Sequence, residues 1–196
     1  MTQNLILAST SPYKKMLLQR LQLEFSCQPP RVDETALSAE CPSAMAQRLA
    51  EQKALAVAAK FPDTLVIGAD QVADLHGKIL GKPGNHQRAV AQLSAQSGQK
   101  MQFHSGISVV QQLANGQIRK QTRVNTTEVQ FKALSLQQIE NYLHAEQPYD
   151  CAGSFKSEAL GISLFSSINS NDPSSLIGLP LIDLCSILAD YGVETL

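Results

Sequence analysis

The sequence predicts an α/β fold in which a mixed sheet is flanked by helices. Residues 4–8 and 65–69 are expected to be buried strands, because 5–8 and 65–69 are continuous apolar runs. A proline suited to a first helical position follows the first run, which indicates a strand followed by a helix. Residues 114–116, Ala-Asn-Gly, indicate a hairpin between two further strands, 100–112 and 117–131. Buried strands combined with hairpin-joined strands are typical of a mixed sheet.

The first half of the chain is predicted to alternate strands and helices. A helix is expected over 12–22, because apolar residues recur there with helical spacing. Residues 23–27 alternate like a half-exposed strand, which the following pair of prolines ends. A long helix rich in Ala is predicted over 42–60, with Pro62 beyond its end. A strand followed by a helix is the layout typical of α/β folds.

The second half is predicted to contain a hairpin and three helices in addition to the two long strands. These elements are a hairpin of residues 72–75 and 78–80, a helix over 85–97, a helix over 136–146 and a last helix over 179–190. The S-x-x-Q pattern of Ser135 and Gln138 is a capping box and supports the helix that starts there. The polar residues 168–175 are the only segment with the composition of a linker.

Composition and charge exclude several classes of function. With 196 residues, 43% of them hydrophobic, the chain is long enough to bury a substantial core. Its 16 Lys and Arg against 17 Asp and Glu leave a net charge of −1, so no broad basic face is expected to bind a nucleic acid polymer. No signal peptide or apolar run of about 18 residues is evident, so we expect a cytoplasmic protein without a membrane partner.

The cysteines and histidines do not form a recognisable metal or redox motif. The four cysteines, Cys27, Cys41, Cys151 and Cys185, lack a C-x-x-C pair and are expected to be reduced thiols. The four histidines, His76, His86, His104 and His144, lack H-x-x-x-H spacing. We therefore expect each histidine to be a surface or incidental residue.

The turn after the first strand is a candidate phosphate site. Ser9 and Ser11 precede Pro12 at the start of the predicted helix, and Lys14 and Lys15 follow in its first turn. The start of a helix presents unpaired backbone N–H groups, and two ammonium groups nearby favour a polyphosphate. In the alternative interpretation, Ser11 only caps the helix and the lysines are solvated.

Asp70 is the strongest candidate for a catalytic carboxylate. It follows the apolar run 65–69 directly, so we expect the strand to end there and the carboxylate to lie at the carboxyl edge of the sheet. Open α/β folds bind ligands at that edge. In the alternative interpretation, Asp70 only caps a turn. A turn would favour Gly at the next position, and the presence of Gln71 there argues against this alternative.

Two adjacent acidic residues and two further lysines complete the candidate site. Asp33 and Glu34 follow two prolines, and Glu34 together with Asp70 offers the oxygen ligands that a hard divalent cation, Mg²⁺ or Mn²⁺, prefers. Lys53 lies on the Ala-rich helix, and Lys82 lies in a loop that its Gly and Pro neighbours restrict. Both are candidates to contact phosphate, although most lysines are simply solvated.

The segment 151–161 is rich in Gly, Ser, Lys and Glu but matches neither of two common nucleophile or phosphate motifs. It lacks the G-x-S-x-G pattern of a serine hydrolase and the G-x-x-x-x-G-K-[ST] pattern of a P-loop. These two mechanisms are therefore not expected.

Six motifs in this order resemble those of the Maf family of nucleotide pyrophosphatases. They are L-A-S-T-S-P at 7–12, V-D-E at 32–34, G-A-D-Q-V at 68–72, G-K-P at 81–83, A-G-S-F-K-S-E at 152–158 and S-L-I-G-L-P-L at 175–181. The resemblance implies one domain over residues 1–196, made of two lobes with an elongated mixed sheet and a central cleft, as in inosine triphosphatases. It further implies a divalent metal and cleavage of a nucleoside triphosphate into a monophosphate and pyrophosphate.

The resemblance also implies roles for individual residues. Asp70 matches the family's proton acceptor, whereas Tyr13, Gln71 and Glu158 match positions that tune the choice of base. Gln71 and the S-F-K-S-E sequence are similar to the subgroup that hydrolyses 7-methyl-GTP. An aromatic face and a carboxylate, from Tyr13 and Glu158, would complement the positive charge of a 7-methylated guanine. The alternative for Tyr13 is core packing in the first helical turn.

Two departures and two alternatives accompany this resemblance. Lys14 and Lys15 stand where the family usually has arginines, which keeps the charge but loses bidentate contacts. Ala159 stands where Gly commonly follows the matching Glu. The alternative functions are a pyrophosphatase for other nucleotides, of the dTTP or UTP type, and a non-catalytic nucleotide-binding regulator of cell division. A homodimer is expected only from the resemblance.

Overall fold

The computed structural model describes residues 4–195 and confirms the predicted α/β class. The strands are β1 (Leu5–Ala8), β2 (Ser26–Cys27), β3 (Leu65–Leu75), β4 (Lys78–Leu80), β5 (Lys100–Gln112), β6 (Ile118–Phe131) and β7 (Phe165–Asn169). The α-helices are α1 (Pro12–Gln19), α2 (Pro42–Ala58), α3 (His86–Gln96), α4 (Leu136–Glu146) and α5 (Leu181–Asp190). Three short 3₁₀ helices, η1 (Ala152–Ser154), η2 (Leu160–Leu164) and η3 (Ser175–Ile177), lie between β6 and α5 in the sequence together with α4 and β7.

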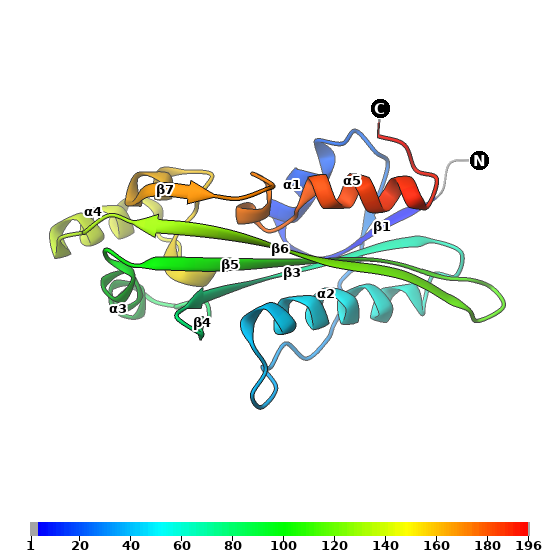
Figure 1. Cartoon of the computed structure of the whole chain (residues 1–196), viewed down its shortest axis with the longest axis horizontal. Helices are drawn as coiled ribbons and strands as arrows, with labels where there is room; N and C mark the ends of the chain where they lie inside the picture. The colour runs from blue at the N-terminus through cyan, green and yellow to red at the C-terminus, as the bar shows by residue number, and fades with distance from the viewer. Residues whose placement is uncertain (1–3, 196) are drawn as a thin grey trace.

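The strands form one mixed sheet that runs the length of the molecule (Figure 1). Their order is β2-β1-β3-β5-β6-β7, and β4 pairs with β3. The β1 strand is parallel to both β2 and β3, whereas the remaining pairs are antiparallel. The long strands β3, β5 and β6 therefore extend through both halves of the molecule.

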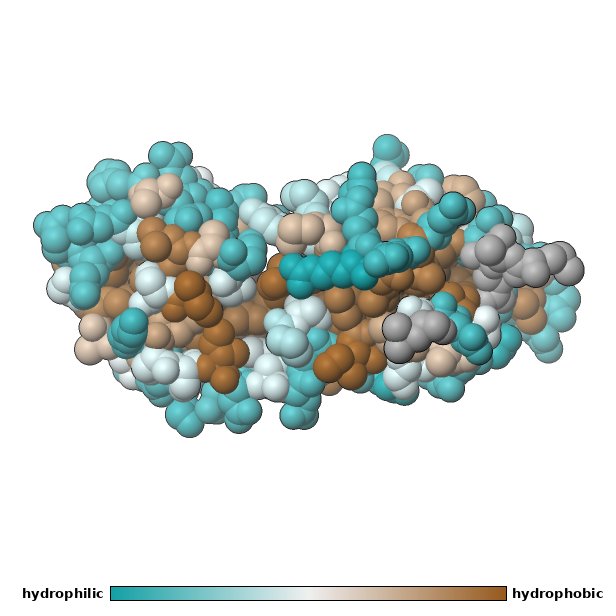
Figure 2. All heavy atoms as spheres, turned by 90° about the horizontal axis from the view of Figure 1, so that it is seen from above, coloured by the Kyte–Doolittle hydropathy of each residue, from teal (hydrophilic) through white to brown (hydrophobic). Residues whose placement is uncertain are grey.

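The helices cover the sheet in two groups, each with its own hydrophobic core. In one half, α2 lies along one face of the sheet, while α1 and α5 lie over the opposite face (Figure 1). In the other half, α3, α4, η1 and η2 enclose a core that includes Phe103, Phe131 and Phe165. The molecule is elongated and indented near its middle (Figure 2). This arrangement confirms the expected two lobes around a shared sheet.

The close approach of α2 to the sheet depends on two glycines. A Cβ atom on Gly68 would lie 2.1 Å from the carbonyl oxygen of Ala50, and one on Gly106 would lie 2.2 Å from that of Ala46. Neither distance is sterically allowed, so any larger residue would push the helix away. The absence of side chains at these two positions brings α2, and with it Lys53, close to the centre of β3.

Three predictions about the fold were wrong. The strand that begins at Leu65 does not end at Asp70 but continues to Leu75, because its backbone stays paired with β5 through Asp74. The segment 168–175 is no linker, since it ends β7 and then forms buried hydrogen bonds around Asp172. His104 is buried rather than incidental, and it lies 3.4 Å from the Asp74 carboxylate.

The long helix rich in Ala, the hairpin between the two long strands and the capping box of Ser135 all occur as expected. All four cysteines are free thiols. Among the described helices, none combines the length and apolar character that a membrane crossing requires.

Candidate active site

A pocket of about 610 Å³ lies where the sheet lacks a strand beside β3. The β1 strand pairs with β3 only as far as Gly68, and β4 pairs with it only from Ala73 onward. On that edge, residues 69–72 have neither neighbour, although β5 continues on the other edge. Asp70, Gln71 and Val72 line the pocket from this gap, and the turns after β1 and β4 line its rim.

Asp70 makes an ion pair with a buried lysine at the floor of the pocket. Side chains alternate along a strand, so Asp70 faces α2, as Gly68 does. Its Oδ1 atom accepts a hydrogen bond of 2.6 Å from the Lys53 ammonium, and the two side chains are only 11% and 10% exposed. The carboxylate is therefore held in one place by a charge-assisted bond within a largely desolvated site.

Lys53 lies between the two carboxylates that the sequence suggested as metal ligands. Its ammonium is 2.7 Å from Glu34 Oε1 as well as 2.6 Å from Asp70 Oδ1. Burial opposes the charge on Lys53, but the Asp70 and Glu34 carboxylates outweigh burial and raise its pKa. Two carboxylates that contact one ammonium converge on one cationic position, and both offer the hard oxygen donors that suit Mg²⁺ or Mn²⁺.

The loop that carries Glu34 is held by an arginine on α2. The Arg48 guanidinium donates to both carboxylate oxygens of Glu40, at 2.6 and 2.7 Å, and to the carbonyl of Thr35 at 3.1 Å. Thr35 in turn donates its backbone N–H and its hydroxyl to Asp33, which lowers the pKa of that carboxyl group. Asp33 thus shapes the turn, and Glu34 points to Lys53.

The start of α1 places one of its two lysines in the pocket. Ser11 caps the helix by accepting from the Lys14 backbone N–H at 3.4 Å, and Ser9 Oγ accepts from the Ser11 backbone N–H at 3.1 Å. Both serines and Lys14 line the pocket. Lys15 is exposed and is not among the lining residues, so the expectation that both ammonium groups face one spot was wrong. Successive helical residues point about 100° apart, which separates the pair.

The ammonium group of Lys14 lies in a strongly charged environment. Burial lowers its pKa, and the nearby Lys53 and Lys82 ammonium groups lower it further, whereas the Asp70 and Glu34 carboxylates oppose this shift. Lys82 also lines the pocket, from the exposed loop after β4. Lys53 contacts the Asp70 carboxylate, and Lys14 interacts with the charges of both Asp70 and Lys82, so three lysines from different elements lie near one another.

Tyr13 and Glu158 lie on another side of the same pocket. Burial, together with the negative charges of Asp150 and Glu158 and the neighbouring Cys151, raises the pKa of Tyr13 to about 12, so its phenol is neutral at pH 7. Asp150, Cys151 and Glu158 also line the pocket. An aromatic ring next to two carboxylates produces a region that favours a cationic group.

Gln71 faces the opposite side of the sheet from Asp70 and holds the η3 segment. Its Nε2 atom lies 2.9 Å from the carbonyl oxygens of Ser175 and Leu176, and 3.1 Å from Ser105 Oγ. These contacts engage its amide nitrogen fully. Gln71 therefore positions the pocket wall near Leu176 rather than presenting a free donor to the cavity.

Two lining residues, Phe103 and Asp150, lie outside every motif in the sequence. Cys151 and Phe155 also line the pocket, and they belong to the segment 151–161, whose composition and motif both drew attention. This segment forms a short turn with a positive φ at Gly153 instead of a regular strand. The position of Lys53 between two carboxylates depends on packing of α2 and was also not predicted.

Comparison with known proteins places this architecture in a family. The family model "Maf-like protein" matches residues 4–191. Similar relatives are 7-methyl-GTP pyrophosphatases of Xanthomonas axonopodis pv. citri, 55% identical over 97% of both chains, and of Colwellia psychrerythraea, 48% identical over 99% of this chain and 96% of the relative. A solved HAM1 protein from Coxiella burnetii aligns over 96% of this chain and 99% of its own, with a TM-score of 0.49 and 15% identity. With nearly its whole length matched, this chain belongs to the Maf family.

Proposed function

We propose that this protein is a nucleoside triphosphate pyrophosphatase that hydrolyses 7-methyl-GTP to 7-methyl-GMP and pyrophosphate. The observation that carries the proposal is the Asp70 carboxylate, fixed by Lys53 at the floor of a pocket that Lys14 and Lys82 also line. The names of the relatives support the reaction and the substrate, since several at about 50% identity are 7-methyl-GTP pyrophosphatases. The pocket's volume of about 610 Å³ lies within the range of small-molecule sites.

The lysines supply the positive charge that a triphosphate needs. Phosphoryl transfer relies on positioning and charge stabilisation more than on covalent chemistry by the protein. Lys14 and Lys82 both line the pocket and are proposed to contact phosphate oxygens, and the α1 turn with Ser9 and Ser11 adds hydroxyl groups. Lys53 neutralises the carboxylates behind them.

Glu34 and Asp70 are the residues that would hold a divalent cation such as Mg²⁺ or Mn²⁺. A cation bound by them supplies Lewis-acid stabilisation of phosphate charge. Asp70 is also the proposed general base, because its second oxygen remains available to orient or deprotonate an attacking water. Tyr13 and Glu158 are proposed to favour a positively charged base, and Gln71 to shape that region through η3.

Asp70→Asn tests the mechanism directly. Replacing the carboxylate by a neutral amide of the same shape is expected to lower the rate of pyrophosphate release from 7-methyl-GTP by at least about 1,000-fold. Circular dichroism and thermal melting should show a folded chain. Pyrophosphate release is measured with Mg²⁺ and with a chelator.

Asp74→Asn is the matched control on the same strand. Asp74 is also buried, but it bonds to His104 and to the Gly77 backbone and does not line the pocket. It is expected to retain turnover within about 10-fold of the native rate. Native turnover in Asp70→Asn, or equal losses in both variants, would refute the assignment of Asp70.

The same assay separates the alternative functions. Faster turnover of dTTP or UTP than of 7-methyl-GTP would indicate a pyrophosphatase of the other substrate class. Tight nucleotide binding without release of pyrophosphate from any triphosphate would indicate a non-catalytic regulator.

A further inference from the structure

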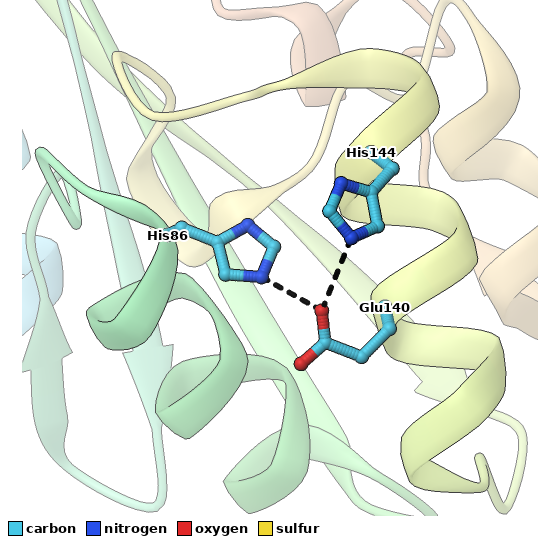
Figure 3. A group of neighbouring side chains, drawn as sticks. All are labelled: His86, Glu140 and His144. Carbon is cyan, nitrogen blue, oxygen red and sulfur yellow. Dashed lines mark hydrogen bonds and ion pairs between the residues drawn. The ribbon is translucent and has the colours of Figure 1, made fainter.

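Three side chains of the types that ligate metals converge at the end of the molecule that α3 and α4 form, outside the pocket described above (Figure 3). His86 is the first residue of α3, and Glu140 and His144 lie on α4. His86 Nε2 is 2.7 Å and His144 Nε2 is 3.7 Å from the same oxygen, Glu140 Oε2. One ligand atom from each residue lies within 4.8 Å of the other two.

The backbone brings these groups together without relying on their own interaction. Glu140 and His144 are four residues apart, so they occupy the same face of α4 on successive turns. The two helices are held side by side by a common hydrophobic core, to which α3 contributes Leu93 and α4 contributes Ile139 and Leu143. The spacing between His86 and the pair on α4 is therefore set by packing beneath them.

The ring of His86 is oriented by a further hydrogen bond. Its Nδ1 atom lies 2.9 Å from the Tyr149 hydroxyl, while its Nε2 atom faces Glu140. A histidine that ligates a metal through one nitrogen usually has its other nitrogen hydrogen-bonded in this way, which fixes the ring. If Nε2 binds a metal, the ring proton belongs on Nδ1, and the hydroxyl of Tyr149 can accept it because a phenol both donates and accepts.

We propose that His86, Glu140 and His144 form a second metal site, for Zn²⁺ or a chemically similar transition-metal ion. Two imidazoles and one carboxylate are a common three-residue zinc set, with the fourth position left to water. Ligand atoms of a tetrahedral zinc site lie about 3.3 Å apart, which follows from bonds of about 2.0–2.1 Å. The distances of 2.7 and 3.7 Å from Glu140 Oε2 lie on either side of this value. All three ligand-atom spacings are within 4.8 Å, and His144, which is 74% exposed, is free to rotate toward the other two groups.

The donor set distinguishes this site from the one at Glu34 and Asp70. Imidazole nitrogen favours zinc, copper or nickel, whereas carboxylates alone favour magnesium or manganese. The two sites therefore select different ions, and an ion at the second site would stabilise the packing of α3 against α4. The backbone carbonyl of Tyr149 accepts a hydrogen bond of 2.9 Å from the Gly84 backbone N–H. Tyr149 also directly precedes Asp150 and Cys151 of the pocket wall. An ion here ties α3 and α4 together next to the loops that carry Lys82 and Asp150.

A binding titration with Zn²⁺ alone as the probe tests the site. The full chain is stripped with a chelator and titrated in excess Mg²⁺, which keeps the carboxylate site of the pocket occupied by the harder ion. We expect one Zn²⁺ per chain, and Co²⁺ in its place should give the intense visible absorption of tetrahedral coordination. At free Zn²⁺ about 100 times the Kd, the Tm should rise by about 5–10 °C.

The variant His144→Ala should weaken Zn²⁺ binding at least about 10-fold and, at the same free Zn²⁺, reduce the rise in Tm by about half or more, without lowering the Tm of the metal-free chain. His76→Ala is the matched control, since His76 is also exposed and bonds to Gln99 rather than to a carboxylate or another histidine. Equal Zn²⁺ binding by the native chain and both variants would overturn the proposal, as would no binding by the native chain. In either case the three residues form an ion pair only. No nucleotide enters the measurement, so its outcome is independent of the proposed pyrophosphatase activity.

Discussion

At the scale of single residues, Lys14 shows how stability and charge recognition oppose each other. Its pKa is lowered chiefly by burial, so the folded chain pays in free energy to keep the ammonium charged at neutral pH. A bound triphosphate would supply the missing countercharge. An anionic ligand in the pocket would therefore stabilise the charged form of Lys14.

The substitution Lys14→Met is expected to raise the Tm by a few degrees at pH 7 while lowering turnover of 7-methyl-GTP about 10- to 100-fold. Between the lowered pKa and 10.5, the unfolded chain binds more protons than the folded chain, so native stability rises with pH in that window. The advantage of the variant should therefore shrink as the pH rises. Melting curves from pH 7 to 10 measure this, and a constant difference in Tm would contradict it.

Glu158 acts on Tyr13 through its charge and is placed to act on a cationic base in the same way. We expect Glu158→Gln to reduce the preference for 7-methyl-GTP over GTP, expressed as the ratio of their kcat/KM values, by about 5- to 30-fold. The kcat/KM for GTP itself should change little. Lys156 flanks the same turn but bonds to the Glu146 carbonyl, so Lys156→Gln is a suitable control. An unchanged ratio in Glu158→Gln would remove this residue from base selection.

At the scale of elements, residues 168–175 show a structure that sequence patterns do not predict. Its polar composition suggested a linker, yet the Asp172 carboxylate is 1% exposed and accepts from the Ser174 and Ile182 backbone N–H groups. Asp172 therefore caps α5 from ten residues upstream of Ile182, a distance at which local cap motifs do not operate. Only the folded chain reveals the partner of such a side chain.

Helices and strands could be predicted where their own residues carry a periodic hydrophobic pattern or a turn signal. The long helix α2 and the strands β5 and β6 followed from periodicity and from one hairpin turn. The continuation of β3 past Asp70 did not, because pairing with β5 outweighs a charged residue in the middle of the strand. In the candidate site, the motifs located Asp70, Lys14 and the acidic loop, but not the ion pairs of Lys53.

Removing the carboxylate of Asp172 should destabilise the chain through α5. Asp172→Ala leaves buried N–H groups without a partner, and we expect the free energy of unfolding to fall by about 2–4 kcal/mol. Asp183→Ala, in the first turn of the same helix, removes a partly exposed carboxylate 3.4 Å from Arg123 and should cost less than about 1 kcal/mol. Urea denaturation followed by circular dichroism gives both values. Similar losses in the two variants would contradict the capping role.

At the scale of the whole molecule, two strands, β3 and β5, contribute to the hydrophobic packing of both halves. The aromatic rings of Phe131, Phe155 and Phe165 pack edge to face in one half, with centroids 4.9–5.8 Å apart. The other half is packed by α1, α2 and α5. Because β3 and β5 are paired along their length, a loss of packing in one half is transmitted through continuous hydrogen-bonded backbone.

We therefore expect the two halves to unfold together. Phe131→Ala should lower the free energy of unfolding by about 3–5 kcal/mol and should speed amide hydrogen exchange at Leu65–Gly68 in the other half as well. Ile162→Ala, at an exposed position, should change stability by less than about 0.5 kcal/mol. Faster exchange confined to the half that contains Phe131 would show that the halves unfold independently.

The pocket occupies a stretch where β3 has lost a neighbour on one edge, while its pairing with β5 on the other edge is unbroken. The turns after β1 and β4 carry Ser9, Ser11 and Lys82, whereas Glu158 lines the pocket from a separate loop. Residues proposed to contact phosphate and the residue proposed to select the base therefore lie on different segments, so base preference can diverge by substitution at Glu158 while the triphosphate contacts stay the same.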